Sequence, residues 1–221
     1  MDGLAAVLLL PRLGGLTPPY RMETARLVVR CWQPTDAAAL KEALDPSVEH
    51  LRPWLPWAHE EPQTLEQKVE LLRQFRGRFD LGQDFVYGIL SADESEAVGG
   101  TGLHTRRGEG TFEIGYWIRE SSAGRGFCTE AVAALTRVGF ELCGIDRIEI
   151  RVDPANGASL AIPRKLGYVE EGTLRGILHG PDGVPMRNDG VVFALMRGEL
   201  EQSPAAGARF RAFDAAGNHV A

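Results

Sequence analysis

The sequence predicts one mixed α/β domain, and two features of the chain lead to this fold class. Three short β-forming runs follow one another with brief turns between them, which is typical of an antiparallel meander. Farther along the chain, helical segments alternate with strands in the order β–α–β–α–β–β. With 221 residues, the chain is long enough for a single domain with a substantial core. We therefore expect a mixed, mostly antiparallel sheet of six to seven strands flanked by about four helices.

The first part of the chain is expected to contain one strand, two helices and a structured loop. Alternating polar and apolar residues predict a strand over 24–32, and a helix is expected over 35–45 because Pro34 suits a first turn. Residues 50–62 carry prolines and tryptophans without a helical period, which indicates a structured loop. Thr64 and the glutamine three residues later resemble a capping box. The apolar residues expected on the buried side of the helix that follows are Leu65, Val69, Leu72 and Phe79.

The remaining elements follow from apolar alternation, turn residues and helix breakers. The expected strands span residues 84–92, 97–106, 111–118, 147–153, 167–174 and 190–197. Helices are expected over 125–142 and over 156–166. We divide the chain into an N-terminal arm over 1–21, a domain over 22–200 and a flexible tail over 201–221, because the tail is rich in Ala and Gly.

Charge and hydropathy exclude two classes of partner. The net charge is −6 and no basic stripe is present, so nothing in the sequence is suited to neutralise the phosphates of a nucleic acid. No run approaches the roughly 18 apolar residues that a membrane span needs. The apolar stretch over 4–10 does not read as a signal peptide, because Asp2 is acidic and no small-residue cleavage site follows. We expect a cytoplasmic protein without nucleic-acid or membrane partners, as a monomer or a homodimer.

Cysteines and histidines give no sign of a metal site. Cys31, Cys128 and Cys143 are widely spaced and form no CxxC pair, which suits a reducing compartment. Four of the five histidines, His50, His59, His104 and His179, also lack metal-ligand spacing, and we interpret each as surface or structural. No metal is expected.

The stretch AGRGFCTEAV, residues 123–132, places Gly124 and Gly126 directly before a predicted helix. Two glycines in this position are compatible with a flexible turn. They are also compatible with an anion site, in which backbone N–H groups approach a phosphate at the helix N-terminus. A Walker A loop is absent, and a Rossmann fingerprint would need glycine where Thr129 stands.

The segments around this loop occur in an order that resembles the GNAT superfamily of acetyl-CoA-dependent N-acetyltransferases. These segments are FEIGYWI, RESSAGRG, FCTEAVAALTRVGF, RIEIRVD and NGASLAIPRKLGY. GRGFCTEA is similar to the RGxGxA-type pyrophosphate loop of the family, and N-x-x-S followed by KLGYVEEG is similar to its second CoA motif. The resemblance covers about residues 22–198 and is nearest to the RimJ/RimL-like branch, which acetylates the N-termini of ribosomal proteins.

The resemblance implies acetyl-CoA as the donor substrate and a set of residues that bind it. The expected CoA-binding residues are Trp117, Ile118, Arg119, Ser122, Ala123, Gly124, Arg125, Gly126, Phe127, Cys128, Asn156 and Ser159. Ala123 and Cys128 depart from the family pattern, which has Gln or Arg and Gly or Ala there. Arg125 either supplies the missing positive charge or is a solvated loop residue. Asn156 reaches the CoA arm, caps the helix that follows, or does both.

The resemblance also implies catalytic roles. In the family, the pantetheine arm adds to the strand that ends here at Ile118, and backbone groups near Trp117 polarise the thioester carbonyl. Glu113 matches a position where such enzymes often place a base; the alternative is a solvent-facing strand glutamate. Pro163 stands where many relatives have a tyrosine that protonates the departing thiolate. Ser159 is therefore the candidate proton donor to the thiolate, although a helix serine commonly bonds a backbone carbonyl instead.

The acceptor is expected to be a primary amine. An α-amino group is roughly a tenth neutral at pH 7, whereas a lysine is neutral about once in a few thousand, which favours a protein N-terminus. Trp54 and Trp57, beside Glu60 and Glu61, are suited to bind an ammonium or simply fix a loop to the core. Acetylation of a small amine, such as an antibiotic, a polyamine or an amino-acid derivative, is the first alternative. A non-catalytic acyl-CoA-binding module is the second.

Overall fold

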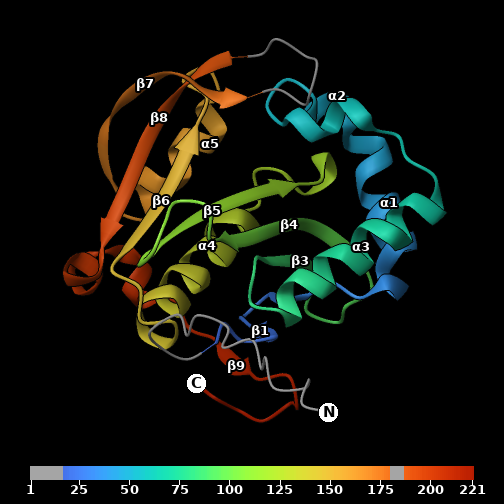
Figure 1. The fold of residues 1–221 in the computed structure, drawn as a ribbon, viewed down its shortest axis with the longest axis horizontal. Helices are drawn as coiled ribbons and strands as arrows, with labels where there is room; N and C mark the ends of the chain where they lie inside the picture. The colour runs from blue at the N-terminus through green and yellow to red at the C-terminus, as the bar shows by residue number, and fades with distance from the viewer. Residues whose placement is uncertain (1–16, 180–186) are drawn as a thin grey trace, which may run out of the picture.

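A single nine-stranded sheet organises the protein in the computed structural model, which describes residues 17–179 and 187–221 (Figure 1). The strands are β1 Arg21–Glu23, β2 Leu27–Cys31, β3 Phe85–Ser91, β4 Ala97–His104, β5 Thr111–Ile118, β6 Arg147–Val152, β7 Val169–His179, β8 Arg187–Met196 and β9 Arg211–Phe213. Their order in the sheet is β7-β8-β6-β5-β4-β3-β2-β1-β9. Only β5 and β6 pair in parallel. The mixed, mostly antiparallel sheet is confirmed, with two short strands, β1 and β9, beyond the six to seven expected.

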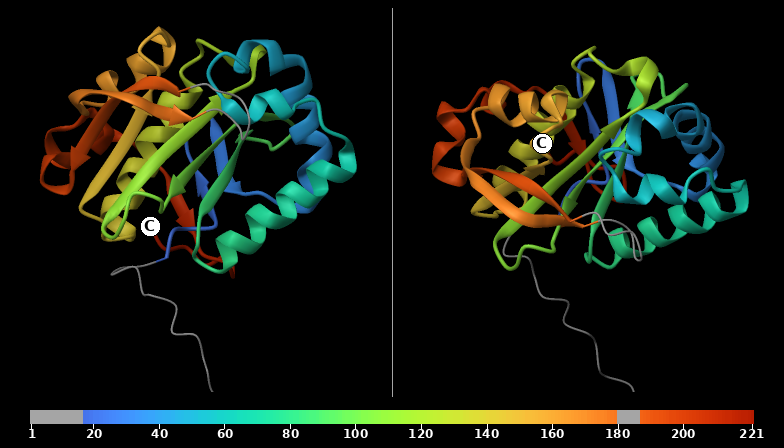
Figure 2. Two further views of the ribbon diagram at one scale, coloured as in Figure 1. Left: turned by 45° about the horizontal axis from the view of Figure 1, so that its top comes forward. Right: turned by 90° about the horizontal axis from the view of Figure 1, so that it is seen from above.

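Helices cover both faces of the sheet (Figures 1 and 2). The α-helices are α1 Ala37–Leu44, α2 Val48–Leu51, α3 Leu65–Asp80, α4 Phe127–Arg137 and α5 Gly157–Lys165. A π-helical turn over Val138–Leu142 continues α4. Short 3-10 turns span Pro34–Asp36, Asp45–Ser47, Pro56–Glu60, Glu120–Ser122, Arg197–Gln202 and Pro204–Gly207. α4 and α5 lie on one face, and α1, α2 and α3 lie on the other.

Two apolar clusters hold these layers together. The larger one joins the sheet to α4 and includes Phe85, Phe112, Leu135 and Phe193. The smaller one surrounds Trp32 and includes side chains from α1 and α3. Because successive strand residues point to opposite faces, Phe112 and Ile114 of β5 face α4, whereas Glu113, Gly115 and Trp117 face the side of α1 and α3. The two faces of β5 therefore contact different apolar clusters.

The buried side of α3 differs from the predicted one. Thr64 and Gln67 form the expected capping box. Leu65 and Val69, however, are 44% and 40% exposed, while Lys68 is fully buried. Lys68 can be buried because its ammonium forms an ion pair with the buried Glu61. Compared with the prediction, the helix is therefore rotated about its axis, and its buried face contains Lys68, Leu72 and Phe79.

The C-terminal segment belongs to the folded domain. β9 pairs antiparallel with β1, with Ala212 opposite Met22, and both residues are buried. Arg211 also forms an ion pair with Glu23. The expectation of a flexible tail from residue 201 is therefore wrong for this strand, because the small side chain of Ala212 packs into the sheet. Residues 1–16 of the expected N-terminal arm lie outside the described residues.

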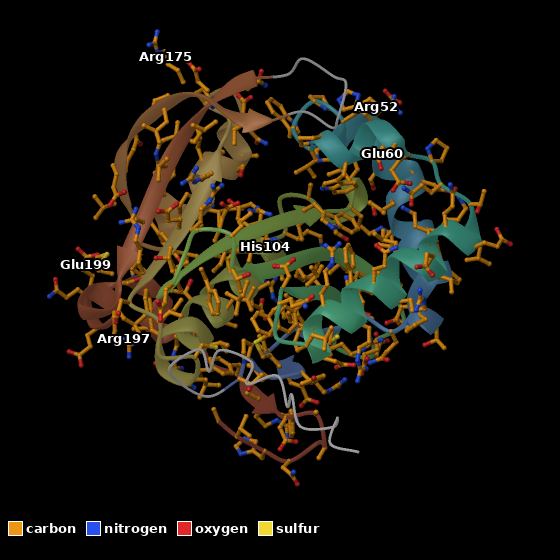
Figure 3. All side chains as sticks on the ribbon, viewed as in Figure 1. Arg52, Glu60, His104, Arg175, Arg197 and Glu199 are labelled. Carbon is orange, nitrogen blue, oxygen red and sulfur yellow. The ribbon has the colours of Figure 1, made fainter. Side chains whose placement is uncertain are left out.

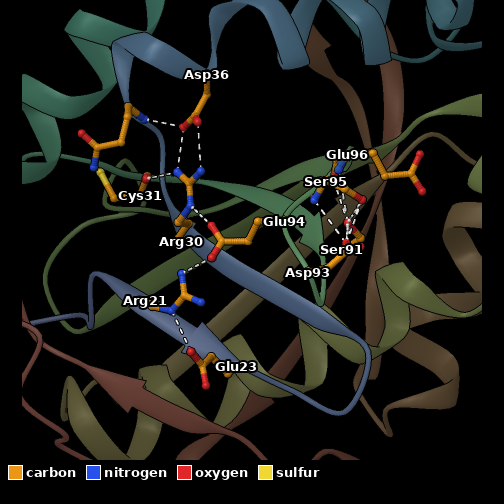
Figure 4. A network of polar contacts seen from close by, with 11 residues as sticks. Arg21, Glu23, Arg30, Cys31, Asp36, Ser91, Asp93, Glu94, Ser95 and Glu96 are labelled. Atoms are coloured by element: carbon orange, nitrogen blue, oxygen red, sulfur yellow. Dashed lines mark hydrogen bonds and ion pairs between the residues drawn. The ribbon is translucent and has the colours of Figure 1, made fainter.

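A polar network fixes the edge of the sheet next to β1 (Figure 4). The guanidinium of Arg30 binds both carboxylate oxygens of Asp36, at 2.7 and 2.9 Å, and one oxygen of Glu94 at 2.6 Å. Arg21 binds the other oxygen of Glu94 at 2.7 Å. Hydrogen bonding to Asp36 outweighs burial and raises the pKa of Arg30. These contacts attach β1 and β2 to the β3–β4 turn.

Candidate active site

A gap between β5 and β6 forms the centre of the candidate site. The parallel ladder joins only Thr111–Glu113 to Arg147–Glu149. Beyond Glu113, the next residues of β5 stay paired with β4 on one side, as far as Ile118. No described strand pairs with their other edge, so the backbone there is available to an extended ligand.

The glycine loop at the end of β5 has a backbone geometry suited to binding an anion. Gly124 and Gly126 have φ values of 74° and 80°, which favour glycine because a Cβ is disfavoured there. A Cβ on Gly124 would meet no atom within 4 Å. α4 begins at Phe127 with Gly126 as its N-cap and without a side-chain cap, which leaves the first-turn N–H groups for a ligand. The loop thus fits a diphosphate.

Arg26 supports this loop from the other end of the chain. Its Nη1 donates to the carbonyl of Arg125 at 3.0 Å, and its Nε binds Glu130 of α4 at 2.7 Å. Its guanidinium also lies 4.8 Å from the centre of the Phe127 ring. The guanidinium of Arg125 lies 4.7 Å from the same ring. Arg26 was missed by the sequence reasoning because its partners lie about 100 residues away and no local pattern connects them.

The other expected CoA-binding residues lie at the end of β5 and in the turn that follows it. Arg119 forms an ion pair with Glu96 at 3.0 Å, Ser122 is buried, and Ala123 is exposed. Trp117 and Ile118 end β5 beside the cradle. Their contact with CoA stays a prediction.

Helix α5 lies across the gap from β5. The Oδ1 atom of Asn156 accepts a hydrogen bond from the Ser159 amide at 3.0 Å, so Asn156 caps this helix. The Tyr116 hydroxyl donates to the Ser159 carbonyl at 3.2 Å and lies 3.1 Å from the Ser159 hydroxyl. Burial raises the pKa of Tyr116, which keeps the phenol protonated. The sequence analysis did not identify Tyr116, although strand alternation places its side chain on the other face of β5 from that of Trp117.

Glu113 lies where expected, but its carboxylate is engaged. It is only 6% exposed, and it forms ion pairs with Arg106 through Oε1 and with Arg107 through Oε2. Burial alone would raise the pKa of Glu113, but the hydrogen bonds and charges of the two arginines outweigh burial and lower the pKa. The alternative of a solvent-facing glutamate does not hold. A carboxylate of lowered pKa is a weak proton acceptor.

The two tryptophans of the 50–62 segment have different surroundings. The ring of Trp57 meets the ring of Trp117 edge-on, with centroids 6.0 Å apart. Trp54 lines a hollow of about 530 Å³. The other residues lining this hollow are Pro53, Asp153, Pro154, Ala155, Asn188 and Asp189.

Glu61 does not take the place that the sequence suggested for it. Its carboxylate is buried and paired with Lys68, so it is not free to bind an ammonium. Glu60 remains exposed. From the sequence we also expect the segment 175–189 to be a loop that recognises the substrate. Its residues 175–179 and 187–189 belong to β7 and β8 instead, and 180–186 lie outside the described residues.

Two searches of the described ranges gave negative results. Between residues 17 and 179 and from 187 onward, no group of three or more His, Cys, Asp or Glu side chains is arranged to hold a metal ion. In the same ranges, no helix is both long and apolar enough to cross a bilayer.

Comparison with known proteins now identifies the class of protein. The acetyltransferase (GNAT) domain family matches residues 26–169. The chain therefore belongs to the GNAT family, and it is an N-acetyltransferase, as the order of its motifs predicted.

Individual relatives agree with this assignment. The chain is 29% identical over 161 residues to the ribosomal protein uS5-alanine N-acetyltransferase of Escherichia coli, covering 70% of this chain and 81% of that one. It is 28% identical over 165 residues to the uncharacterized N-acetyltransferase YoaA of Bacillus subtilis, covering 74% and 90%. The structure of Mycobacterium smegmatis RimJ in complex with CoA-disulfide superimposes with a TM-score of 0.72 at 27% identity, covering 86% of this chain and 94% of that one.

Proposed function

We propose that this N-acetyltransferase transfers the acetyl group of acetyl-CoA to the N-terminal α-amine of a protein, of the ribosomal-protein type, in the cytoplasm. Donor and acceptor bind together and the amine attacks directly. The observation that carries the donor side is the uncapped start of α4 behind two left-handed glycines, Gly124 and Gly126. This arrangement is suited to the diphosphate of CoA.

The donor substrate would extend from this cradle along the free edge of β5. Backbone groups of Ile114–Ile118 can pair with the pantetheine arm as a neighbouring strand would. N–H groups near Trp117 and Ile118 would polarise the thioester carbonyl. The Ser159 hydroxyl, in contact with the Tyr116 hydroxyl, would return a proton to the departing sulfur.

The acceptor side is supported by the hollow beside Trp54. It is a shallow, open hollow between the 50–62 segment, the residues that follow β6 and the start of β8. Trp54 and Trp57 would contact the peptide, with Asp153 and Asp189 in the same hollow attracting positively charged groups of the peptide as it approaches. An α-amine is favoured over lysine because far more of it is neutral near pH 7.

Thiol release from acetyl-CoA tests this proposal against three sets of acceptors. The first set is peptides with free Ala or Ser N-termini, the second is the same peptides with a blocked N-terminus and one lysine, and the third is polyamines and aminoglycosides. We expect kcat/KM for the first set to exceed that for the second by at least roughly tenfold at pH 7. Turnover confined to the third set would replace the proposal with small-amine acetylation. CoA binding without any turnover would favour a non-catalytic acyl-CoA-binding module.

A further inference from the structure

A histidine and a carboxylate lie side by side on the face of the sheet that α1 and α3 cover. The Nδ1 atom of His104 lies 2.9 and 3.1 Å from the two carboxylate oxygens of Asp84. Both side chains are partly exposed, at 16% and 24%. Figure 3 places His104 near the middle of the sheet, on β4 beside β5. The sequence alone indicates only a surface or structural role for this histidine.

Two glycines make room for the imidazole ring. Gly102 of β4 and Gly115 of β5 are opposite each other in the ladder. A Cβ on Gly102 would lie 2.9 Å from His104 Nε2, and a Cβ on Gly115 would lie 3.1 Å from it. Any other residue at either position would crowd the ring, so the glycines allow it to lie over the backbone with Nε2 above Gly115.

Gly115 lies where the gap opens. Glu113 is the last residue of β5 that pairs with β6, and Gly115 is two residues farther along, on the same face of the strand. Tyr116 and its partner Ser159 lie on the opposite face. A thioester placed along the free edge of β5 would therefore have His104 on one side and the two hydroxyls on the other. An amine that attacks the thioester carbonyl from one side and a sulfur that is protonated on the other would use these two groups separately.

The hydrogen bond to Asp84 determines which nitrogen of the imidazole can accept a proton. With its hydrogen on Nδ1, donated to the carboxylate, the ring keeps a lone pair on Nε2. Within the described residues, no hydrogen bond involves Nε2, and no buried side-chain nitrogen or oxygen lacks a partner. Nε2 is therefore not completely buried, and it is the ring nitrogen left to accept a proton.

We propose that His104 is the base that deprotonates the acceptor amine and that Asp84 is its positioning residue. This inference rests on the proposed function, because it concerns the same acetyl transfer. Glu113, opposite His104 in the ladder, is committed to Arg106 and Arg107 and is the weaker candidate. The charged groups that face this region are Asp84, Arg106, Arg107, Glu113, Glu149 and Arg151.

The proton balance is complete without another reactant. The amine arrives as an ammonium and gives one proton to His104 Nε2, and the imidazolium formed is held by the Asp84 carboxylate. The neutral nitrogen then forms the C–N bond, and the C–S bond breaks with its electron pair on sulfur. On the other face, sulfur takes a proton from the Ser159–Tyr116 hydroxyl side, which is reprotonated from water, and the second amine proton is lost to water on the His104 side. The imidazolium finally releases its proton to water.

The first experiment compares His104→Gln with His219→Gln, an exposed histidine in the C-terminal segment. The acceptor is whichever amine class the wild-type enzyme acetylates. We expect His104→Gln to lower kcat/KM by roughly 10²–10⁴-fold, with CoA affinity from calorimetry within twofold of wild type. His219→Gln should match wild type. A His104→Gln enzyme that keeps more than a third of wild-type kcat/KM overturns the inference. A different result would contradict the proposed function: a wild-type enzyme that acetylates no peptide with a free α-amine.

The second experiment separates a positioning role for Asp84 from a purely structural one. ¹⁵N NMR of the histidine side chains in the wild-type protein should show His104 protonated on Nδ1 with Nε2 free. In Asp84→Asn, we expect this tautomer preference to be lost and the acid limb of the pH–rate profile to move, with the CD spectrum retained. A wild-type spectrum with the proton on Nε2, or an unchanged pH profile in Asp84→Asn, contradicts the inference.

Discussion

The Tyr116 hydroxyl lies 3.1 Å from the Ser159 hydroxyl and joins β5 to α5 across the gap between β5 and β6. This contact is on the α4–α5 side of the sheet, whereas Glu113 and Gly115 face the other side. The strand thus separates the hydroxyl pair from the side on which an acceptor would approach. We assign the departing sulfur to the hydroxyl side for this reason.

Removal of the Ser159 hydroxyl should slow acetyl transfer without weakening CoA binding. We expect Ser159→Ala to lower kcat by roughly 10²-fold, at the lower end of the usual contribution of a proton donor. The Tyr116 hydroxyl remains nearby and can pass a proton through water, which limits the loss. Stopped-flow thiol release and calorimetry with CoA check this. An unchanged kcat would remove Ser159 from the donor role.

Replacing Glu113 should have a smaller effect than replacing His104. The lowered pKa of Glu113 means that its ion pairs are present above its ordinary pKa of 4.5 and are lost only as the pH falls through the lowered value. Loss of activity between pH 6 and 7 therefore cannot come from this carboxylate. We expect Glu113→Gln to lower kcat/KM by less than tenfold at pH 7. A fall of roughly 10²–10⁴-fold would restore Glu113 as the base.

A side chain at Gly126 should disturb the cradle. Gly126 and Gly217 have almost the same positive φ, 80° and 81°, so valine at either position costs strain of about 1–2 kcal/mol or more. Only Gly126 lies at the start of α4. We expect Gly126→Val to raise the Kd for CoA at least tenfold and Gly217→Val to leave it within twofold. Equal Kd values in both variants would mean that the cradle lies elsewhere.

The buried ion pair of Lys68 and Glu61 should be costly to break from one side. Lys68 is fully buried and the Glu61 side chain is 2% exposed, so Lys68→Met leaves a carboxylate without its partner. We expect a loss of about 3–5 kcal/mol in the free energy of unfolding by urea. Lys68→Met with Glu61→Leu should recover most of it. As a control, Arg73→Ala breaks an exposed pair with Glu70 and should leave the free energy of unfolding almost unchanged.

The parts of the fold that depend on local pattern were predictable. Strand 111–118 has the bounds that its alternation predicted, and the order of segments from it to α5 gave the family. The capping box at Thr64 was also visible, because its two side chains are three residues apart. Such features are determined by neighbours in the sequence.

The parts that depend on tertiary contacts were not predictable. The burial of Lys68 needs Glu61 at the correct depth in the fold, and no helical period of apolar residues reports that. Arg26 reaches Glu130 across 104 residues. The contact of His104 with Asp84 became visible only when β3 and β4 were placed side by side. The candidate base was therefore missed, although the sequence did indicate the glycine loop that we propose as the donor cradle.

Titration of the ¹⁵N-labelled protein with CoA tests the central claim most directly. If the start of α4 holds the diphosphate, the backbone amide resonances of residues 122–128 will shift in proportion to CoA bound, and more than those of the strand at 211–213. CoA that binds and leaves the amides of 122–128 unshifted would contradict the account.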